Sequence, residues 1–147
     1  MKTLVVDIDG TIAKIGDRIK YIQKEPKDWD SFYAHCLEDK PIEAIITLVE
    51  SMYATGFNLV FCTGRSEKVR SETMEWLNKN LDYVYDFKLL MRPEGDYSED
   101  CVLKPKLLEE AGYDPSNVLL ILEDRDTVVK KWRELGYTCL QVAKGDY

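Results

Sequence analysis

Two carboxylates one residue apart follow an apolar run near the beginning of the sequence. Asp7 and Asp9 come directly after residues 4–6, and Gly10 and Thr11 follow them. Consecutive apolar residues indicate a buried strand of a parallel sheet. Ligands bind at the carboxyl ends of such strands, and a glycine there lets the backbone pass close to a ligand. The motif therefore predicts a binding crevice, although Asp and Gly are also common in simple turns.

Polar residues also follow two later apolar runs, at 57–62 and 117–122. They are Thr63, Gly64 and Arg65 after the first run, and Glu123 and Asp124 after the second. Helical patterns alternate with the apolar runs, so the strands should be parallel and their carboxyl ends should share one edge of the sheet. We therefore expect the first, second and fourth strands to bring together Asp7, Asp9, Thr63, Glu123 and Asp124.

Four carboxylates at one site predict a divalent cation. They cannot all be ionised in a dry cleft without one, and all-oxygen ligands favour Mg²⁺ held by carboxylates and a substrate phosphate. One carboxylate could attack phosphorus to form an aspartyl-phosphate, and a second could protonate the leaving alcohol. The transferred phosphoryl group also needs a hydroxyl and a cation. Thr63 is the candidate hydroxyl, and Lys104 and Arg65 are the candidate cations.

Several other kinds of site are excluded by the sequence. A calcium loop beginning at Asp7 would need a glutamate at its twelfth position, where Arg18 stands. The chain has one histidine, His35, so a zinc site or a triad built on histidines is excluded. There is no Gly-x-x-x-x-Gly-Lys-Ser/Thr loop for a nucleoside triphosphate.

Composition narrows the class of protein further. The 147 residues carry a net charge of −7, with a pI near 4.8, so no general basic surface would attract nucleic acid. Four widely spaced cysteines without a Cys-x-x-Cys motif fit reduced thiols in the cytoplasm. We expect a cytoplasmic protein with neither a signal peptide nor a membrane span, and with no obligate protein partner.

The pattern along the chain predicts one α/β domain, residues 1–147, built on a doubly wound parallel five-stranded sheet. The expected strands are 4–6, 57–62, 87–91, 117–122 and 138–142. The expected helices are 41–55, 67–81, 102–111 and 126–135, with Pro105 tolerable only in the first turn of its helix.

Residues 14–40 are too long for an ordinary loop and are expected to fold back over the end of the first strand as an inserted cap segment. Within this segment we expect a short helix at 29–37 capped by Asp28. Trp29 and Tyr33 would either pack the insertion or stack on a nucleic-acid base.

The order of these motifs resembles the four-motif pattern of the haloacid dehalogenase (HAD) phosphohydrolase superfamily, which has a Rossmann-like fold. The resemblance implies that Asp7 is the nucleophile, Asp9 the acid/base, and Thr63 and Lys104 the phosphoryl-binding residues. It also implies a metal site formed by Asp7, the backbone carbonyl of Asp9, Glu123 and Asp124.

Within the superfamily, the sequence is most similar to the 3′-phosphatase domain of bacteriophage polynucleotide kinase/phosphatase enzymes. The matching positions include residues 7–14, 63–65 and 141–147. The resemblance implies that the substrate is bound by Thr11, Arg18, Gly64, Arg65, Arg92 and Asp100. Thr63 and Glu123 stand where the phage enzymes have serine and aspartate, which preserves the chemistry, and the insertion is longer.

Three functions stay open at this point. The resemblance favours a Mg²⁺-dependent phosphatase acting on nucleic-acid 3′ ends, while a 5′-nucleotidase acting on free nucleoside monophosphates fits the acidic charge. A phospho-acceptor receiver module also pairs acids with a hydroxyl, a lysine and Mg²⁺. Receivers, however, place the acceptor on the third strand, whereas Asp7 and Asp9 follow the first.

Overall fold

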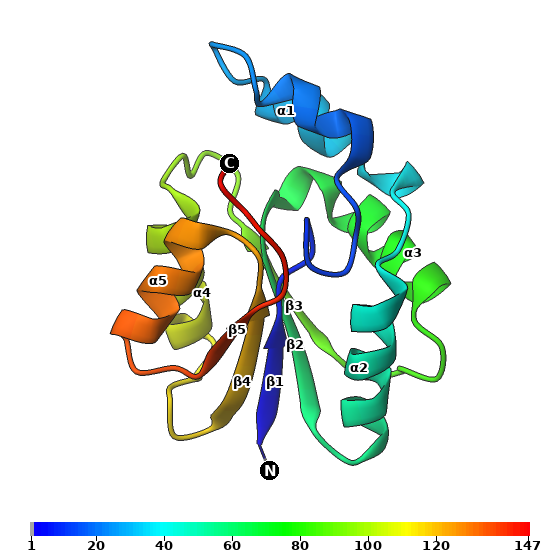
Figure 1. Ribbon diagram of the computed structural model, residues 1–147, viewed down its shortest axis with the longest axis vertical. Helices are drawn as coiled ribbons and strands as arrows, with labels where there is room; N and C mark the ends of the chain where they lie inside the picture. The colour runs from blue at the N-terminus through cyan, green and yellow to red at the C-terminus, as the bar shows by residue number, and fades with distance from the viewer. Residues whose placement is uncertain (1) are drawn as a thin grey trace.

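Residues 2–147 are described by the computed structural model, which is organised around a five-stranded, all-parallel sheet (Figure 1). The order of the strands is β3-β2-β1-β4-β5, so the chain winds outward from β1 in both directions. Their bounds are β1 (Thr3–Val6), β2 (Asn58–Ser66), β3 (Lys88–Arg92), β4 (Val118–Glu123) and β5 (Cys139–Gln141). The predicted α/β fold with a doubly wound parallel sheet is confirmed.

Helices cover both faces of the sheet (Figure 1). They are α2 (Glu43–Ala54), α3 (Arg70–Asn80), α4 (Asp100–Glu110) and α5 (Asp126–Glu134), and a short turn of 3₁₀ helix, η3 (Glu67–Val69), precedes α3. Alternate residues of β1 point to opposite faces. Leu4 and Val6 pack in the apolar core beneath α2 and α3, whereas Val5 packs in the core beneath α4 and α5. Because both faces of β1 are buried, three consecutive residues of the strand, 4–6, can all be apolar.

The segment 14–40 forms a small layer over the carboxyl edge of the sheet (Figure 1). It contains η1 (Gly16–Tyr21), α1 (Trp29–Ala34) and η2 (Cys36–Glu38). Asp28 caps α1 by accepting a hydrogen bond from the backbone N–H of Ser31 at 3.1 Å, as expected. The segment has its own apolar cluster, which includes Ile22, Phe32 and Tyr33.

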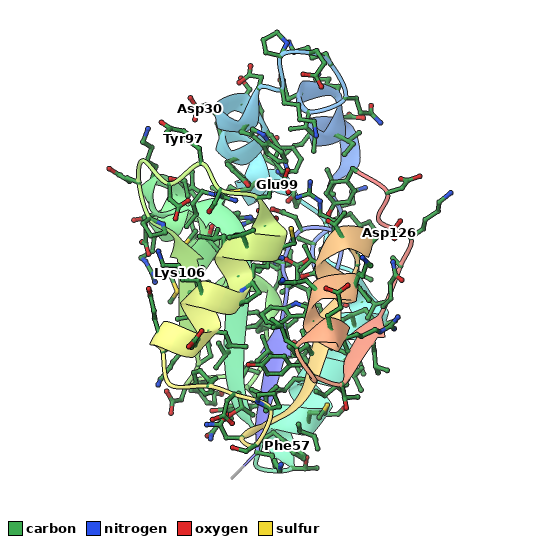
Figure 2. All side chains as sticks on the ribbon, turned by 90° about the vertical axis from the view of Figure 1, so that its left-hand side faces the viewer. Asp30, Phe57, Tyr97, Glu99, Lys106 and Asp126 are labelled. Carbon is green, nitrogen blue, oxygen red and sulfur yellow. The ribbon has the colours of Figure 1, made fainter. Side chains whose placement is uncertain are left out.

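The loop between β3 and α4 also rises towards this cap layer. In Figure 2, Asp30 of α1 lies above Tyr97 of that loop, and both residues line one cavity at the carboxyl edge. The C-terminal segment runs towards the same edge (Figure 1). Three regions of the chain that are distant in sequence therefore surround the ends of β1 and β4: the segment 14–40, the loop before α4 and the C-terminal segment.

Three local predictions need correction. The helix expected at 29–37 ends at Ala34 and is followed by η2. Strand β2 continues through Thr63, Gly64 and Arg65, because Ser66 pairs with Arg92 of β3 after an irregularity in register.

Pro105 lies in the second turn of α4, because the helix begins at Asp100 and not at 102. The proline removes one backbone hydrogen bond there, but packing of Leu103 and Leu108 in the core supports the helix. Among residues 2–147, no helix combines the length and the apolar character needed to cross a bilayer.

Candidate active site

Three carboxylates meet where β1 and β4 end. Asp7 follows β1, Glu123 is the last residue of β4, and Asp124 follows it. Each can offer an oxygen that lies within 4.8 Å of the oxygens offered by the other two. All three are buried, with exposed fractions of 5% for Asp7 and 1% for the others. The two strands are hydrogen-bonded neighbours, so residues more than 110 positions apart in sequence become adjacent.

Lys104 of α4 lies between two of these acids. Its Nζ atom donates to Asp7 Oδ1 and to Glu123 Oε2, both at 2.8 Å. Burial opposes the charged ammonium group, but the two carboxylates outweigh it and raise the pKa of Lys104 well above its usual value. Thr11 donates to the other oxygen of Asp7 at 2.9 Å. Both oxygens of Asp7 are therefore held in a fixed direction.

We call Asp7, Glu123, Asp124 and Lys104 the acidic cluster. Burial and the neighbouring charge of Asp7 raise the pKa values of Glu123 and Asp124. Three acids and one lysine leave an excess of negative charge, which a bound divalent cation would relieve. The donor set is all oxygen, and such ligands suit Mg²⁺. The residues present therefore fit the expected metal.

Two features fix the position of Asp124. Gly10 has a φ of +83°, and a side chain there would overlap the Asp124 carboxylate. Tyr147 donates its hydroxyl to Asp124 Oδ2 at 2.9 Å, and the same hydroxyl lies 3.2 Å from the carbonyl oxygen of Asp9. Tyr147 thus touches two groups that the sequence analysis assigned to the metal site.

Asp9 lies in a second group of charges, which we call the arginine cluster: Asp9, Arg18, Asp39 and Arg65. Asp9 Oδ1 accepts from Nη2 of both Arg18 and Arg65 at 2.7 Å. Arg18 also donates from Nε to Asp39 at 2.8 Å, and Arg65 Nη2 lies 3.5 Å from Asp39. Burial favours the neutral form of Asp9, but Arg65 and Arg18 outweigh it and hold the pKa of Asp9 well below its usual range.

The structure therefore separates the two carboxylates of the first motif. The side chain of Asp7 belongs to the acidic cluster, whereas that of Asp9 faces the arginines. Only the backbone carbonyl of Asp9 is directed towards the Asp124 side of the site, through their shared partner Tyr147.

Thr63 lies beside the acidic cluster, as the sequence indicated. It is 1% exposed, and its Oγ atom accepts the backbone N–H of Arg65 at 3.2 Å. Thr63, Asp7 and Lys104 line the same narrow cavity at the carboxyl edge of the sheet.

Asp100, which the resemblance assigned to substrate binding, forms ion pairs with two arginines. Its carboxylate accepts from Arg92 Nη2 at 2.6 Å and from Arg125 Nη1 at 3.2 Å. Arg92 also donates from Nε to the carbonyl oxygen of Gly64 at 2.9 Å. This ion-paired group connects β2, β3, α4 and the start of α5 at the rim of the narrow cavity.

Three further residues contact groups of the site. Asp39 lies in the arginine cluster, Tyr147 contacts Asp124, and Tyr33 donates to the carbonyl oxygen of Gly64 at 3.0 Å. The sequence marked Tyr33 as an aromatic residue that either packs the insertion or stacks on a nucleic-acid base. No local pattern distinguishes Asp39. Tyr147 lies in the matching stretch 141–147, but the resemblance assigned it no role.

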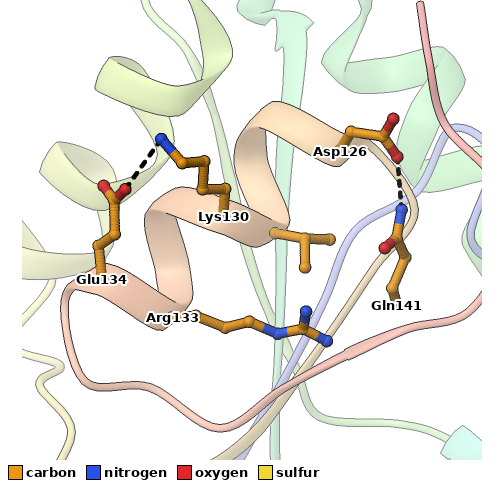
Figure 3. Close-up of a pocket in the computed structure, with 6 residues that line it drawn as sticks. Asp126, Lys130, Arg133, Glu134 and Gln141 are labelled. Carbon is orange, nitrogen blue, oxygen red and sulfur yellow. Dashed lines mark hydrogen bonds and ion pairs between the residues drawn. The ribbon is translucent and has the colours of Figure 1, made fainter.

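Another depression lies on the outer face of α5, beside β5 (Figure 3). Lys130 pairs with Glu134 at 3.1 Å, and Gln141 donates to Asp126 at 2.6 Å. These exposed groups satisfy one another, so the chemistry expected from the sequence belongs to the carboxyl edge.

Comparison with known proteins decides the family. A family model described as the polynucleotide kinase PNKP phosphatase domain, of HAD type, matches residues 1–147. The chain belongs to this family. It is therefore a HAD phosphatase, as the sequence motifs implied.

Individual relatives of this HAD phosphatase agree with the family model. A protein of Autographa californica nuclear polyhedrosis virus, inferred to be a bifunctional polynucleotide kinase/RNA ligase, is 31% identical over 137 residues, 91% of this chain. A chain in the Pnkp1/Rnl/Hen1 RNA repair complex is 29% identical, with a TM-score of 0.83 over 99% of this chain. The phosphatase spans 18% of the viral protein and 43% of the chain in the complex.

More distant structures share the fold alone. A haloacid dehalogenase-like hydrolase from Streptococcus pneumoniae is 14% identical, with a TM-score of 0.62 over 95% of this chain and 83% of that one. These structures thus agree with a HAD-like fold for the phosphatase.

Proposed function

We propose that this HAD phosphatase is a Mg²⁺-dependent polynucleotide 3′-phosphatase that works through an aspartyl-phosphate on Asp7. The observation that carries the proposal is the setting of Asp7. It lies at the end of β1 with one oxygen bonded to Lys104 and the other to Thr11, in the wall of a cavity that also contains Thr63. Membership of the polynucleotide kinase phosphatase family supports nucleic-acid 3′ ends as the substrate.

In the first step, an oxygen of Asp7 forms a bond to phosphorus, and the bond from phosphorus to the 3′ oxygen of the nucleic acid breaks. Lys104 and the Thr63 hydroxyl stabilise the negative charge that is spread over the phosphoryl oxygens. Because Lys104 is buried and already fixed by Asp7 and Glu123, little rearrangement is needed for this role. In the second step, water attacks phosphorus, releases inorganic phosphate and restores the Asp7 carboxylate.

Asp9 is the proposed acid for the leaving 3′ oxygen and the base that later activates water. The arginine cluster keeps Asp9 ionised, so it must lose contacts with Arg18 or Arg65 before it can carry a proton. An incoming substrate is itself an anion and competes with Asp9 for the two guanidinium groups. Substrate binding would thereby free the Asp9 carboxylate from its contacts with the arginines. The same exchange gives Arg18 and Arg65 their proposed role in substrate binding.

The proposed metal ligands are carboxylate oxygens of Asp7 and Asp124 and the carbonyl oxygen of Asp9. Glu123 lies beside them and completes the proposed metal site. Bound Mg²⁺ would supply positive charge next to the transferred phosphoryl group. Thr11, Gly64, Arg92 and Asp100 line or support the remaining walls of the site and are proposed to position the substrate.

The test compares phosphate release from a 3′-phosphorylated oligonucleotide with release from deoxynucleoside 5′-monophosphates, each with Mg²⁺ and with a chelator. We expect turnover of the 3′-phosphorylated substrate only when Mg²⁺ is present. Preference for the 5′-monophosphates would instead identify a nucleotidase. Stable labelling of the protein without turnover of either substrate would identify a receiver-like phospho-acceptor.

A further inference from the structure

We propose that a second, larger cavity binds the unpaired nucleotides that immediately precede the 3′-phosphate. We call it the aromatic cleft; its lining includes Lys27, Trp29, Tyr33, Lys68, Arg92 and Tyr97. The inference rests on the proposed function and extends it from the phosphate to the strand that carries it. The ligand is a single-stranded nucleic-acid end, and not a free mononucleotide or a duplex end.

The aromatic cleft is continuous with the catalytic cavity. Trp29, Tyr33, Asp100 and Arg125 line both, so a phosphate beside Asp7 leaves the rest of its strand at the entrance to the cleft. The cleft has a volume of about 570 Å³. Small-molecule sites usually occupy about 300–1,000 Å³. This space suits one or two nucleotides, but it is too small for the end of a double helix.

Aromatic side chains from two segments, α1 and the loop before α4, line the cleft. Trp29 comes from α1 and is packed against Tyr33, with ring centroids 5.8 Å apart and nearly parallel rings. Tyr97 comes from the loop before α4 and lies below Asp30 of α1 in Figure 2. Tyr97 is 93% exposed, so the fold does not need its ring for packing. An exposed ring beside a cavity can stack on any unpaired base, because every base has an aromatic face.

Acids and basic residues balance in the lining of the cleft, which favours local contacts with a strand over general attraction of nucleic acid. The acids are Asp30, Asp96, Glu99 and Asp100, and the basic residues are Lys27, Lys68, Arg92 and Arg125. Arg92 and Arg125 are paired with Asp100, whereas Lys27 and Lys68 form no ion pair with any of residues 2–147. Lys27 lies over the Trp29 ring, with its Nζ atom 5.7 Å from the ring centroid, so it can contact a phosphodiester group beside that ring. Lys68 can contact a phosphodiester group without breaking an ion pair. The chain as a whole carries a charge of −7, so binding should come mainly from stacking and should fall only moderately with salt.

The experiment measures kcat and KM for 3′-phosphorylated single strands of increasing length, starting from a nucleoside 3′-monophosphate, in both DNA and RNA series. We expect KM to fall by about tenfold as the first one or two nucleotides are added and then to level off. The Tyr97→Ala variant should lose most of this gain in KM with little change in kcat. Tyr85→Ala is the matched control, because Tyr85 is 82% exposed and lies in the loop before β3, at the opposite edge of the sheet.

Binding is measured separately, by fluorescence anisotropy of labelled single-stranded and duplex oligonucleotides with a 3′-hydroxyl end. Tighter binding of single strands that weakens in Tyr97→Ala, but not in Tyr85→Ala, would support the cleft even if no 3′-phosphate were hydrolysed; that combination would overturn only the proposed function. A KM independent of length, equal binding of duplex and single strand, or an unchanged length dependence in Tyr97→Ala would overturn the cleft.

Discussion

The acidic cluster and the arginine cluster are neighbours, yet they solve the problem of buried charge in opposite ways. The acidic cluster places three carboxylates around one lysine and keeps an excess of negative charge. The arginine cluster places two carboxylates against two guanidinium groups and neutralises itself. A divalent cation would relieve the first arrangement, whereas the second has no charge for a cation to balance.

The clusters also differ in the parts of the chain that build them. The acidic cluster uses residues at the ends of β1 and β4 together with α4, all of which belong to the sheet and its covering helices. The arginine cluster takes Arg18 and Asp39 from the inserted segment. Its ion pairs therefore join the insertion to Asp9. Under the proposed function the two clusters have separate tasks: chemistry at the acidic cluster, and coupling of the insertion to the proposed acid/base at the arginine cluster.

The largest expected effect follows replacement of Asp7, which removes the proposed nucleophile from the acidic cluster. Asp7→Asn should lower kcat by ~10³-fold or more, because the covalent step is lost. The fold should survive, since the amide is close in shape and can still accept from Lys104. Phosphate release and circular dichroism are the measurements. Near-normal phosphate release from a folded variant would rule out the covalent step.

Replacement of Asp39 should break the balance of the arginine cluster. Asp39→Ala leaves Arg18 and Arg65 with one carboxylate between them, and loss of one partner from a buried ion pair costs about 3 kcal/mol or more. The free energy of unfolding, measured with urea, should fall by that amount. Asp17→Ala, an exposed acid in the same segment, is the control and should change stability by less than about 0.5 kcal/mol. Equal effects of the two substitutions would mean that the arginine cluster does not stabilise the insertion.

Replacement of Tyr147 should have a smaller effect, confined to the acidic cluster. Tyr147→Phe removes the hydroxyl that orients Asp124, and groups that orient metal ligands affect metal affinity by about tenfold or more. Titration calorimetry with Mg²⁺ should detect this weakening in the absence of substrate. Tyr85→Phe again serves as the control. Unchanged Mg²⁺ affinity in Tyr147→Phe would restrict the residue to a packing role.

The smallest expected effect is the pH dependence of stability without added metal. Burial and the charge of Asp7 raise the pKa of Glu123 to about 7 and that of Asp124 to about 9. The folded protein then binds these protons more tightly than the unfolded chain, whose carboxyl groups titrate near pH 4. Stability should therefore fall as pH rises from about 4 to 9, lowering Tm by about a few degrees.

Added Mg²⁺ should sharpen this contrast, because it competes with the protons for the same carboxylates. It should raise Tm more at pH 8 than at pH 5. A larger stabilisation by Mg²⁺ at pH 5 would contradict the assignment of the acidic cluster as the metal site.

The sequence predicted those parts of the molecule that depend on local pattern. Apolar runs marked the five strands, and the polar residues after them placed Asp7, Thr63, Glu123 and Asp124 at one edge. The partition of Asp7 and Asp9 between two clusters was beyond such reasoning, because it depends on Arg18 and Arg65 approaching from other segments. The position of Pro105 in the second turn of α4 likewise reflects tertiary packing that outweighs a local preference.

Long-range contacts explain the residues that the sequence did not reveal. Tyr147 reaches the carbonyl of Asp9 across 138 positions, and Asp39 pairs with Arg18 across 21. Asp39 lies within no recognisable motif, and Tyr147 ends the matching stretch 141–147 without an assigned role. Their roles follow from the path of the C-terminal segment and from the folding of the insertion, which composition and periodicity do not specify.

The most direct test of the difference between the two clusters is the anomalous diffraction of crystals soaked with Mn²⁺ as a substitute for Mg²⁺. We predict one strong peak about 2.0–2.3 Å from carboxylate oxygens of Asp7 and Asp124, and no peak within the arginine cluster. A peak bound by the side chains of Asp9 or Asp39, with none beside Asp7 and Asp124, would contradict the account.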